Sequence, residues 1–300
     1  VLWQEYGISS YVRGSAQQLV WQSYYMLADA LRYETPRVVV FNVLSLMYGE
    51  PQSEAYNRMT LDGMEWSPVK VSAIRASATA GESLASYLLP ALRYHSRWDQ
   101  LTAEDLRYAF RAGEPVSDSG YLLQTGVQPR DPSVNDAELK KPLINAALPA
   151  SSMEWLDRLY RLCEENGILL VLFKAPTNSW RYWWYDEWDA KISAYAVRRS
   201  LPYCNAIPAA DSIGLDWSAD TYDGGVHLNV SGAEKLSVWF GRYLRADSAL
   251  SDAPTPRSPL SGVRAWSGSR QENTGNETVK SKIGEALPGR SSPALSSIFP

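Results

Sequence analysis

Short apolar runs that alternate with helical patterns constrain the fold of this chain more than any other feature. The runs Arg37–Leu44 and Ile168–Phe173 are rich in β-branched and aliphatic side chains, and Pro202–Ile207 is a weaker run of the same kind. Such runs are typical of strands that are covered on both faces of a parallel sheet. The adjacent or nearly adjacent parallel strands that we expect are Val38–Val43, Leu169–Phe173 and Tyr203–Ala206.

Helical patterns separate these runs, which predicts an α/β fold with a parallel sheet and helices on both of its faces. One helix follows Gly14-Ser15, carries apolar residues up to Ala30 and is closed by Pro36. Ser231 is expected to cap the last helix, which runs through Leu244, with Glu234 completing a capping box. The remaining expected helices of this pattern are Met153–Glu165 and Glu187–Arg199.

Two stretches do not follow this alternation of strands and helices. The stretch from about Glu50 to Pro149 is predicted to be a partly helical insertion, with helical segments at Gly81–Tyr94 and Thr102–Phe110. It follows the first strand, where α/β folds usually carry substrate-facing elements. The segment Ala246–Pro300 is rich in Ser, Pro and Gly and lacks apolar periodicity, so we expect a disordered tail after a domain of residues 1–245.

Composition excludes several classes of protein. The net charge is −4 and the lysines and arginines do not cluster, which argues against a nucleic-acid partner. The longest apolar run has six residues, far short of the roughly 20 that cross a bilayer, so no membrane span is expected. Cys163 and Cys204 form neither a disulfide framework nor a metal site, and we expect both to be small buried residues.

Any histidine-dependent chemistry must use His95 or His227, the two histidines of the chain. His227 lies in a glycine-containing loop, four residues after Asp223 and seven after Asp220. A carboxylate beside an imidazole can accept the Nδ1 proton and leave Nε2 free as a general base for a serine. The alternative is a loop histidine with a local hydrogen bond and no chemistry. We expect His95 to be structural or to anchor the insertion.

The segment Asp223–Leu236 resembles the last block of the SGNH/GDSL hydrolase superfamily, in which an Asp and a His precede the C-terminal helix. Further blocks resemble a bacterial, Firmicute-type, cell-surface branch of that superfamily, and the resemblance covers roughly residues 1–245. These blocks are Gly14–Gln18, Glu50–Met59, Arg93–Trp98 and Lys174–Pro176.

This resemblance implies a three-layer α/β/α fold of the SGNH-hydrolase or flavodoxin-like type. It also implies a Ser-His-Asp enzyme, without cofactor or metal, that hydrolyses or transfers an acyl group, often acetyl, on a carbohydrate or another ester. His227 would be the base and Asp223 its orienter, while Gly14 and Asn42 would form the oxyanion hole. The superfamily's usual Asp-x-x-His spacing puts Gly224 in the acid position, which leaves Asp220 open as a substitute.

The nucleophile is where the chain departs from this branch. There the serine lies in a Gly-Ser-Ser turn after the first strand, upstream of the segment that matches Val1–Tyr6, and the 300 residues contain no such strand and turn. We therefore expect an N-terminally truncated enzyme that lacks its first strand. Ser15, which follows Gly14 and opens a helix, is the alternative nucleophile. Full-length relatives carry an N-terminal anchor, which predicts an extracellular or cell-surface location.

Other readings stay open. The segment Asn178–Trp188 holds four Trp and two Tyr, which can stack on sugar rings or pack in the core. Lys174 lies at the end of a strand, a position typical of site residues. The alternative, which we favour, is a snorkelling lysine whose charged end reaches solvent. The whole chain is alternatively a non-catalytic glycan-binding or scaffold protein, or the product of a broken coding sequence. The sequence does not separate hydrolase from transferase.

Overall fold

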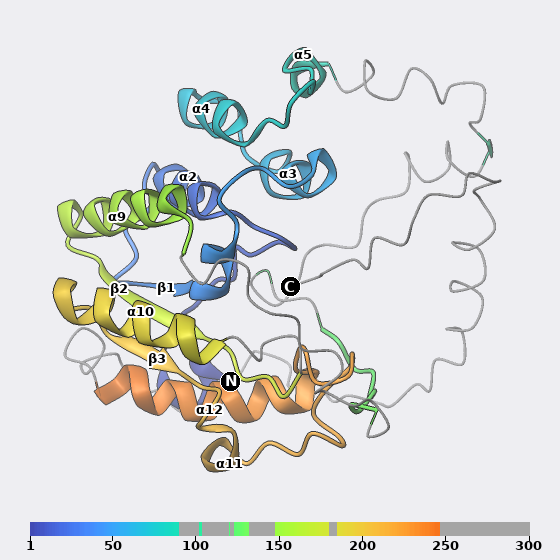
Figure 1. The fold of residues 1–300 in the computed structure, drawn as a ribbon, viewed down its shortest axis with the longest axis vertical. Coiled ribbons are helices and arrows are strands. Elements are labelled where there is room, and N and C mark those ends of the chain that lie inside the picture. The colour runs from blue at the N-terminus through green and yellow to red at the C-terminus, as the bar shows by residue number, and fades with distance from the viewer. Residues whose placement is uncertain (90–101, 104–119, 121–122, 132–147, 180–184, 247–300) are drawn as a thin grey trace, which may run out of the picture. The chain divides into compact units, whose positions relative to one another are not determined.

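The described part of the chain contains a parallel three-stranded sheet. Strand β1 (Val38–Asn42) pairs with β2 (Leu169–Lys174), and β2 pairs with β3 (Tyr203–Asn205), both in parallel (Figure 1). The prediction of parallel strands in these three runs is confirmed, and the protein is a mixed α/β structure. The structure is a computed structural model that describes residues 1–89, 102–103, 120, 123–131, 148–179 and 185–246.

Helices connect the strands and occupy most of the predicted positions. Strand β1 ends at Asn42 because the Asn42 Oδ1 accepts a hydrogen bond from the Leu44 N–H at 3.1 Å, which begins a 3-10 helix, η1 (Val43–Met47). The α-helices of the described residues are α1 (Leu2–Tyr6), α2 (Val20–Ala30), α3 (Glu54–Leu61), α4 (Pro68–Ser77), α5 (Ala85–Leu88), α9 (Ala150–Glu165), α10 (Tyr185–Arg199), α11 (Ala210–Ile213) and α12 (Val230–Ala246).

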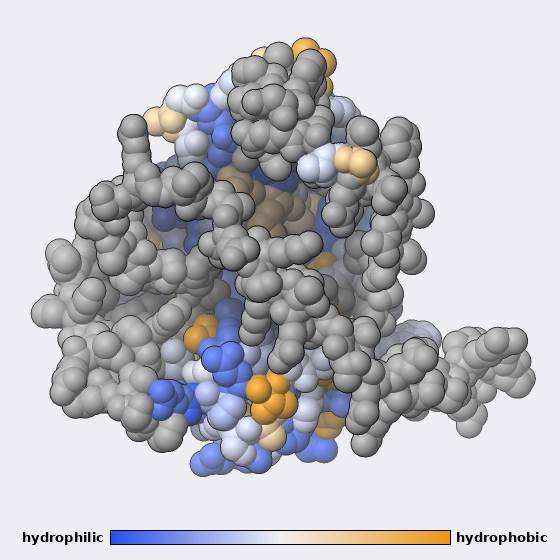
Figure 2. Space-filling model, turned by 90° about the vertical axis from the view of Figure 1, so that its right-hand side faces the viewer, coloured by the Kyte–Doolittle hydropathy of each residue, from blue (hydrophilic) through white to orange (hydrophobic). Residues whose placement is uncertain are grey.

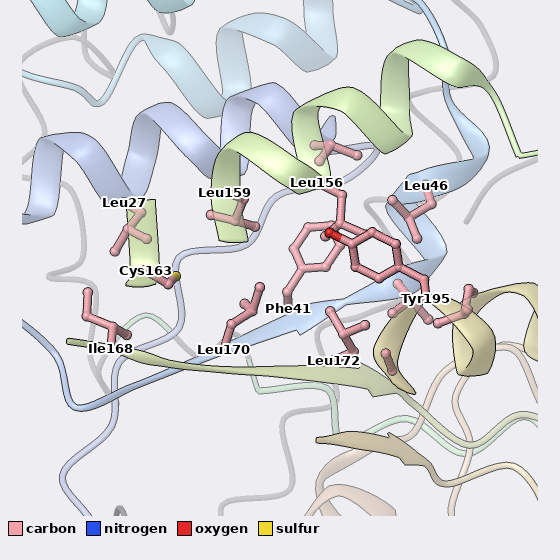
Figure 3. Packing of buried hydrophobic residues seen from close by; sticks show 14 of the residues in the cluster. Leu27, Phe41, Leu46, Leu156, Leu159, Cys163, Ile168, Leu170, Leu172 and Tyr195 are labelled. Carbon is pink, nitrogen blue, oxygen red and sulfur yellow. The ribbon is translucent and has the colours of Figure 1, made fainter. Parts of the chain in front are cut away.

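Alternate side chains of β2 enter two different apolar clusters. Leu170 and Leu172 pack with buried residues of α2, α9 and α10, as Figure 3 shows for Leu27, Leu159 and the neighbouring side chains. Val171 belongs to the second cluster, which includes apolar residues of α1 and α12. Since neighbouring residues of a strand point to opposite faces, helices cover both faces of β2.

The packing of α10 on the sheet can be tested with a conservative substitution that removes one buried methylene group. Ile192 is 1% exposed in the cluster around Leu172. We expect Ile192→Val to lower the free energy of unfolding by about 0.5–1.5 kcal/mol, because a buried methylene group is lost. Urea denaturation measures this. Val197→Ala, at a side chain of α10 that is 79% exposed, should change the stability by less than about 0.5 kcal/mol. Equal losses for both variants would contradict this packing.

Two local predictions are wrong. The last helix is capped by Asn229, whose Oδ1 accepts a hydrogen bond from the Gly232 N–H at 3.2 Å. Ser231 lies inside the first turn, where its Oγ donates to Asp220 at 2.7 Å. Within the expected helix Gly81–Tyr94, the described residues form only the single turn α5, and residues 90–94 lie outside the described residues.

Other predictions fall largely outside the described residues. Of the expected helix Thr102–Phe110, residues 104–110 lie outside them, and so does the tail from residue 247 onward. Within the expected insertion, α3 and α4 are helical, and their buried side chains pack together beside Tyr25 of α2. Cys163 and Cys204 are both buried and free, as expected of small core residues.

Candidate functional site

His227 lies on a tight loop, which we call the His loop (Thr221–Asn229), between α11 and α12. An antiparallel bridge between Thr221 and Leu228 closes this loop. Gly224 and Gly225 form its tip with φ angles of 78° and 86°, a left-handed conformation that L side chains rarely adopt. The sequence therefore folds locally into a turn that brings residues 223 and 227 together.

Both carboxylate oxygens of Asp223 bind His227. Oδ2 is hydrogen-bonded to the ring Nδ1, and Oδ1 accepts from the backbone N–H of His227 at 2.7 Å. Burial alone would raise the pKa of Asp223, but the hydrogen bonds from the ring and backbone of His227, together with the charge of the ring, hold this pKa below its usual value. Asp223 is therefore an ionised, orienting partner of the imidazole at neutral pH.

The other ring nitrogen of His227 is available for chemistry. Because Nδ1 faces a carboxylate, it carries the proton in the neutral ring, and Nε2 presents a lone pair. Among the described residues Nε2 has no hydrogen-bond partner, and the His227 side chain is 43% exposed. The ring of Tyr222 stacks on the imidazole, with centroids 5.8 Å apart and planes 13° apart. This arrangement can accept a proton from a hydroxyl group.

Asp220, the other candidate orienter, has a different role. Its side chain is fully buried and accepts hydrogen bonds from Lys235 Nζ at 2.6 Å, Ser231 Oγ at 2.7 Å and the Asp216 N–H at 2.7 Å. Burial alone would raise the pKa of Asp220, but these hydrogen bonds, led by the one from Lys235, hold it below the usual value. Asp220 therefore anchors the start of α12 and does not contact the imidazole.

This anchor predicts a change in acid stability. A carboxyl group whose pKa is lower in the folded than in the unfolded state stabilises the fold above its unfolded pKa of 3.8, and this stabilisation is lost as the pH falls through the folded value. Removing the cation with Lys235→Met should move acid unfolding to higher pH and lower stability near pH 5 by about 1 kcal/mol. Circular dichroism during an acid titration measures this. An unchanged acid midpoint would show that Lys235 does not lower the pKa of Asp220.

Hydrogen bonds hold the His loop at the carboxyl end of β2. Thr177 Oγ1 donates to the Gly225 carbonyl at 2.6 Å, and the backbone N–H of Asn178 donates to the same oxygen at 3.1 Å. A Cβ atom at Gly225 would overlap the side chain of Asn178, so this close approach requires glycine. Ligand sites of α/β proteins usually form at this edge of the sheet.

The two expected oxyanion-hole residues are exposed. Asn42 ends β1, which runs parallel to β2, so Asn42 lies at the same edge of the sheet as the residues after β2. Its Oδ1 is held by the Leu44 N–H, and its amide nitrogen has no hydrogen-bond partner among the described residues. Gly14 lies in a segment without strand structure, and α2 begins only at Val20, so the expectation that Ser15 opens a helix is wrong. In the described part of the chain, neither residue is hydrogen-bonded to the His loop.

Ser15, the alternative nucleophile, is engaged elsewhere. Its Oγ lies 2.5 Å from Thr60 Oγ1 of α3, and its backbone N–H donates to Gln18 Oε1 at 3.0 Å. Thr60 in turn contacts the buried Gln22, whose amide donates to Asn57 at 2.9 Å. Ser15 thus belongs to a polar network that joins α2 to α3, and no hydrogen bond joins it to His227.

Lys174 differs from the favoured expectation, whereas Trp188 agrees with the core-packing alternative for the aromatic segment. Lys174 is 3% exposed, so its favoured interpretation as a snorkelling lysine is wrong; burial lowers its pKa to about 8. Trp188 is buried in the core, which excludes it from stacking on a sugar. Residues 180–184 and His95 lie outside the described residues.

Sequence reasoning missed one segment next to the His loop, the residues 123–131 of the expected insertion. The backbone N–H of Gln128 donates to the Thr221 carbonyl at 2.9 Å, and the Gly224 N–H donates back to the Gln128 carbonyl at 2.8 Å. Main-chain hydrogen bonds of this kind can be made by almost any residue type, so no pattern in the sequence could have indicated them.

Comparisons of the chain with protein-family models, with curated proteins and with solved structures found no match. Among the described residues, no helix combines the length and the apolar character needed to cross a bilayer. The same residues contain no group of three or more His, Cys, Asp or Glu side chains that could hold a metal ion. On the face shown in Figure 2, exposed apolar side chains occur between polar ones.

Proposed function

We propose that this protein is an acyl-ester hydrolase or O-acyltransferase that acts on an acylated carbohydrate of the cell surface. The observation that carries this proposal is the Asp223–His227 pair, which fixes the imidazole tautomer and leaves Nε2 available on an exposed ring at the carboxyl end of β2. The resemblance of this segment to the last SGNH/GDSL block supports the same reading.

In the proposed mechanism, Nε2 of His227 takes the proton of a serine hydroxyl while the serine oxygen attacks the acyl carbonyl. The negative charge that develops on the carbonyl oxygen is stabilised by the Asn42 amide and the Gly14 backbone N–H. The protonated imidazole then gives its proton to the departing sugar oxygen. Water or a second hydroxyl group, deprotonated by His227, captures the acyl group and frees the serine. Asp223 keeps its charge throughout and stabilises the imidazolium.

The proposal includes a three-layer α/β/α fold and a serine in a Gly-Ser-Ser turn upstream of Val1, as in the family that the chain resembles. The open side of β1 supports this arrangement. Among the described residues β1 pairs only with β2, and Val40 in its middle is 42% exposed. Apolar strands are seldom left open at the edge of a sheet, so a further strand beside β1 would satisfy both its backbone and its side chains.

A second candidate is a non-catalytic glycan-binding or scaffold protein on the same fold. It is favoured by the fact that, within the described ranges, no serine is hydrogen-bonded to Nε2 of His227. A binding protein can keep an ordered loop at the sheet edge without a nucleophile.

Labelling with a fluorophosphonate, which reacts with activated serines, separates these candidates. We expect a chain extended upstream by a segment that carries Gly-Ser-Ser to hydrolyse an aryl acetate and to be labelled at that serine, as located by peptide mass spectrometry. The 300-residue chain should be unlabelled. Labelling of Ser15 would move the nucleophile to the Gly14 turn. Absence of labelling from both chains, with calorimetric binding of an acetylated oligosaccharide, would instead support the binding protein.

A further inference from the structure

The segment Leu123–Asp131, which we call the strap, is hydrogen-bonded along its length to the His loop and its ends. Besides the two main-chain bonds of Gln128, the Val230 N–H donates to the Gln124 carbonyl at 2.8 Å. The side chain of Asn229 donates to the Gly126 carbonyl at 3.0 Å. The strap therefore contacts the loop before Asp223, at the glycine tip and after His227.

Arg130 ties the strap to the second segment that holds the His loop. Its Nη1 donates to the Asn178 carbonyl at 3.1 Å, while the Asn178 N–H donates to the carbonyl of Gly225. The His loop is thus enclosed between the strap and the residues that follow β2, and Arg130 is a side-chain link between those two supports.

The side chains of the strap are mostly exposed. Leu123 is 50% exposed, Val127 is 59% exposed, and the residues between them are exposed or half-buried. A segment that contributes so few side chains to the core adds little hydrophobic stabilisation. Its hydrogen bonds, by contrast, go to the loop that carries the catalytic pair.

We infer that the strap is a positioning element for the Asp223–His227 pair, with Arg130 as its brace. This inference rests on the proposed function. A loop whose tip is Gly224-Gly225 is intrinsically free to change conformation, so bonds from outside must hold it in one geometry. Misplacement of a catalytic group by about 1 Å costs on the order of 10²-fold in rate. We expect a rate loss of up to this size when the hydrogen bonds of the strap are lost.

The test compares three variants, Arg130→Ala, Arg130→Lys and Arg75→Ala. Each is made in the 300-residue chain and in the chain extended upstream by the Gly-Ser-Ser segment. Arg75 is an exposed arginine of α4 and serves as the matched control. For hydrolysis of an aryl acetate we expect Arg130→Ala to lower kcat by about 10- to 100-fold with KM unchanged within about twofold. Arg130→Lys, which keeps a donor for the Asn178 carbonyl, should recover most of this loss. Arg75→Ala should have no effect.

A second readout does not depend on activity. The proton that joins His227 Nδ1 to Asp223 gives a downfield NMR signal, assigned by its absence in His227→Ala. We expect Arg130→Ala, and Gln128→Pro, which removes the N–H donor to Thr221, to weaken this signal through faster exchange, while the unfolding midpoint stays close to that of the parent.

The possible outcomes separate this inference from the proposed function. An unchanged signal and an unchanged kcat in Arg130→Ala would overturn the positioning role. A signal that weakens only in step with a lower unfolding midpoint would also overturn it, because the effect would then be general destabilisation. A weakened signal in a protein that hydrolyses no ester would retain the strap as a support of the pair and reject the proposed function.

Discussion

In the chain extended upstream by the Gly-Ser-Ser segment, Asp223→Asn is expected to lower kcat for aryl acetate hydrolysis by about 10⁴-fold, as for the corresponding substitution in serine proteases. The carboxylate holds the Nδ1 proton of His227 and so leaves the lone pair on Nε2. An amide in its place can donate to Nδ1, which moves the ring proton to Nε2 and removes the base. The loss corresponds to about 5.5 kcal/mol of transition-state stabilisation.

Asp220→Asn is the matched comparison, because Asp220 is a buried carboxylate three residues earlier in the same region. Its hydrogen bonds go to Lys235, Ser231 and Asp216, so its substitution should lower the unfolding midpoint and change kcat by less than about tenfold. Steady-state kinetics and urea denaturation of the two variants measure both effects. A larger loss of kcat in Asp220→Asn than in Asp223→Asn would assign the orienting role to Asp220.

The elements that the sequence predicts well are those decided by local pattern or by burial. The three strands are predicted because runs such as Leu169–Phe173 are too apolar to face water, whatever surrounds them. The contact between Asp223 and His227 is expected from the resemblance of this segment to the last SGNH/GDSL block, and Gly224 and Gly225 between the two residues permit the tight turn that the contact requires. In both cases the deciding interactions lie within a few residues of one another.

The predictions that differ from the structure depend on distant partners. Ser231 and Asn229 are both good caps, and the choice between them follows from Asp220, whose buried carboxylate takes the Ser231 hydroxyl. The strap joins the His loop mainly through backbone atoms, which carry no residue-specific signal. Lys174 is predicted to snorkel because a long lysine side chain can usually carry its charge to solvent, but in the fold this side chain is 3% exposed.

Lys174→Met is expected to stabilise the protein by about 2–3 kcal/mol at pH 7. Burial of the ammonium group lowers its pKa from 10.5 to about 8, which corresponds to about 3 kcal/mol against the charged form. Met has a similar length and no charge, so it removes this cost, although it also loses the hydrogen bond from Nζ to the Ala175 carbonyl. Urea denaturation of both proteins at pH 7 measures the difference.

The same lysine predicts how stability depends on pH. Between about pH 8 and 10.5 the unfolded chain keeps a proton on Lys174 that the folded chain has released, so the Lys174 contribution to stability rises with pH in this interval. Lys174→Met should lack this rise, whereas Lys191→Met, at an exposed lysine of α10, should keep it. Equal pH profiles for all three proteins would contradict burial of the ammonium group.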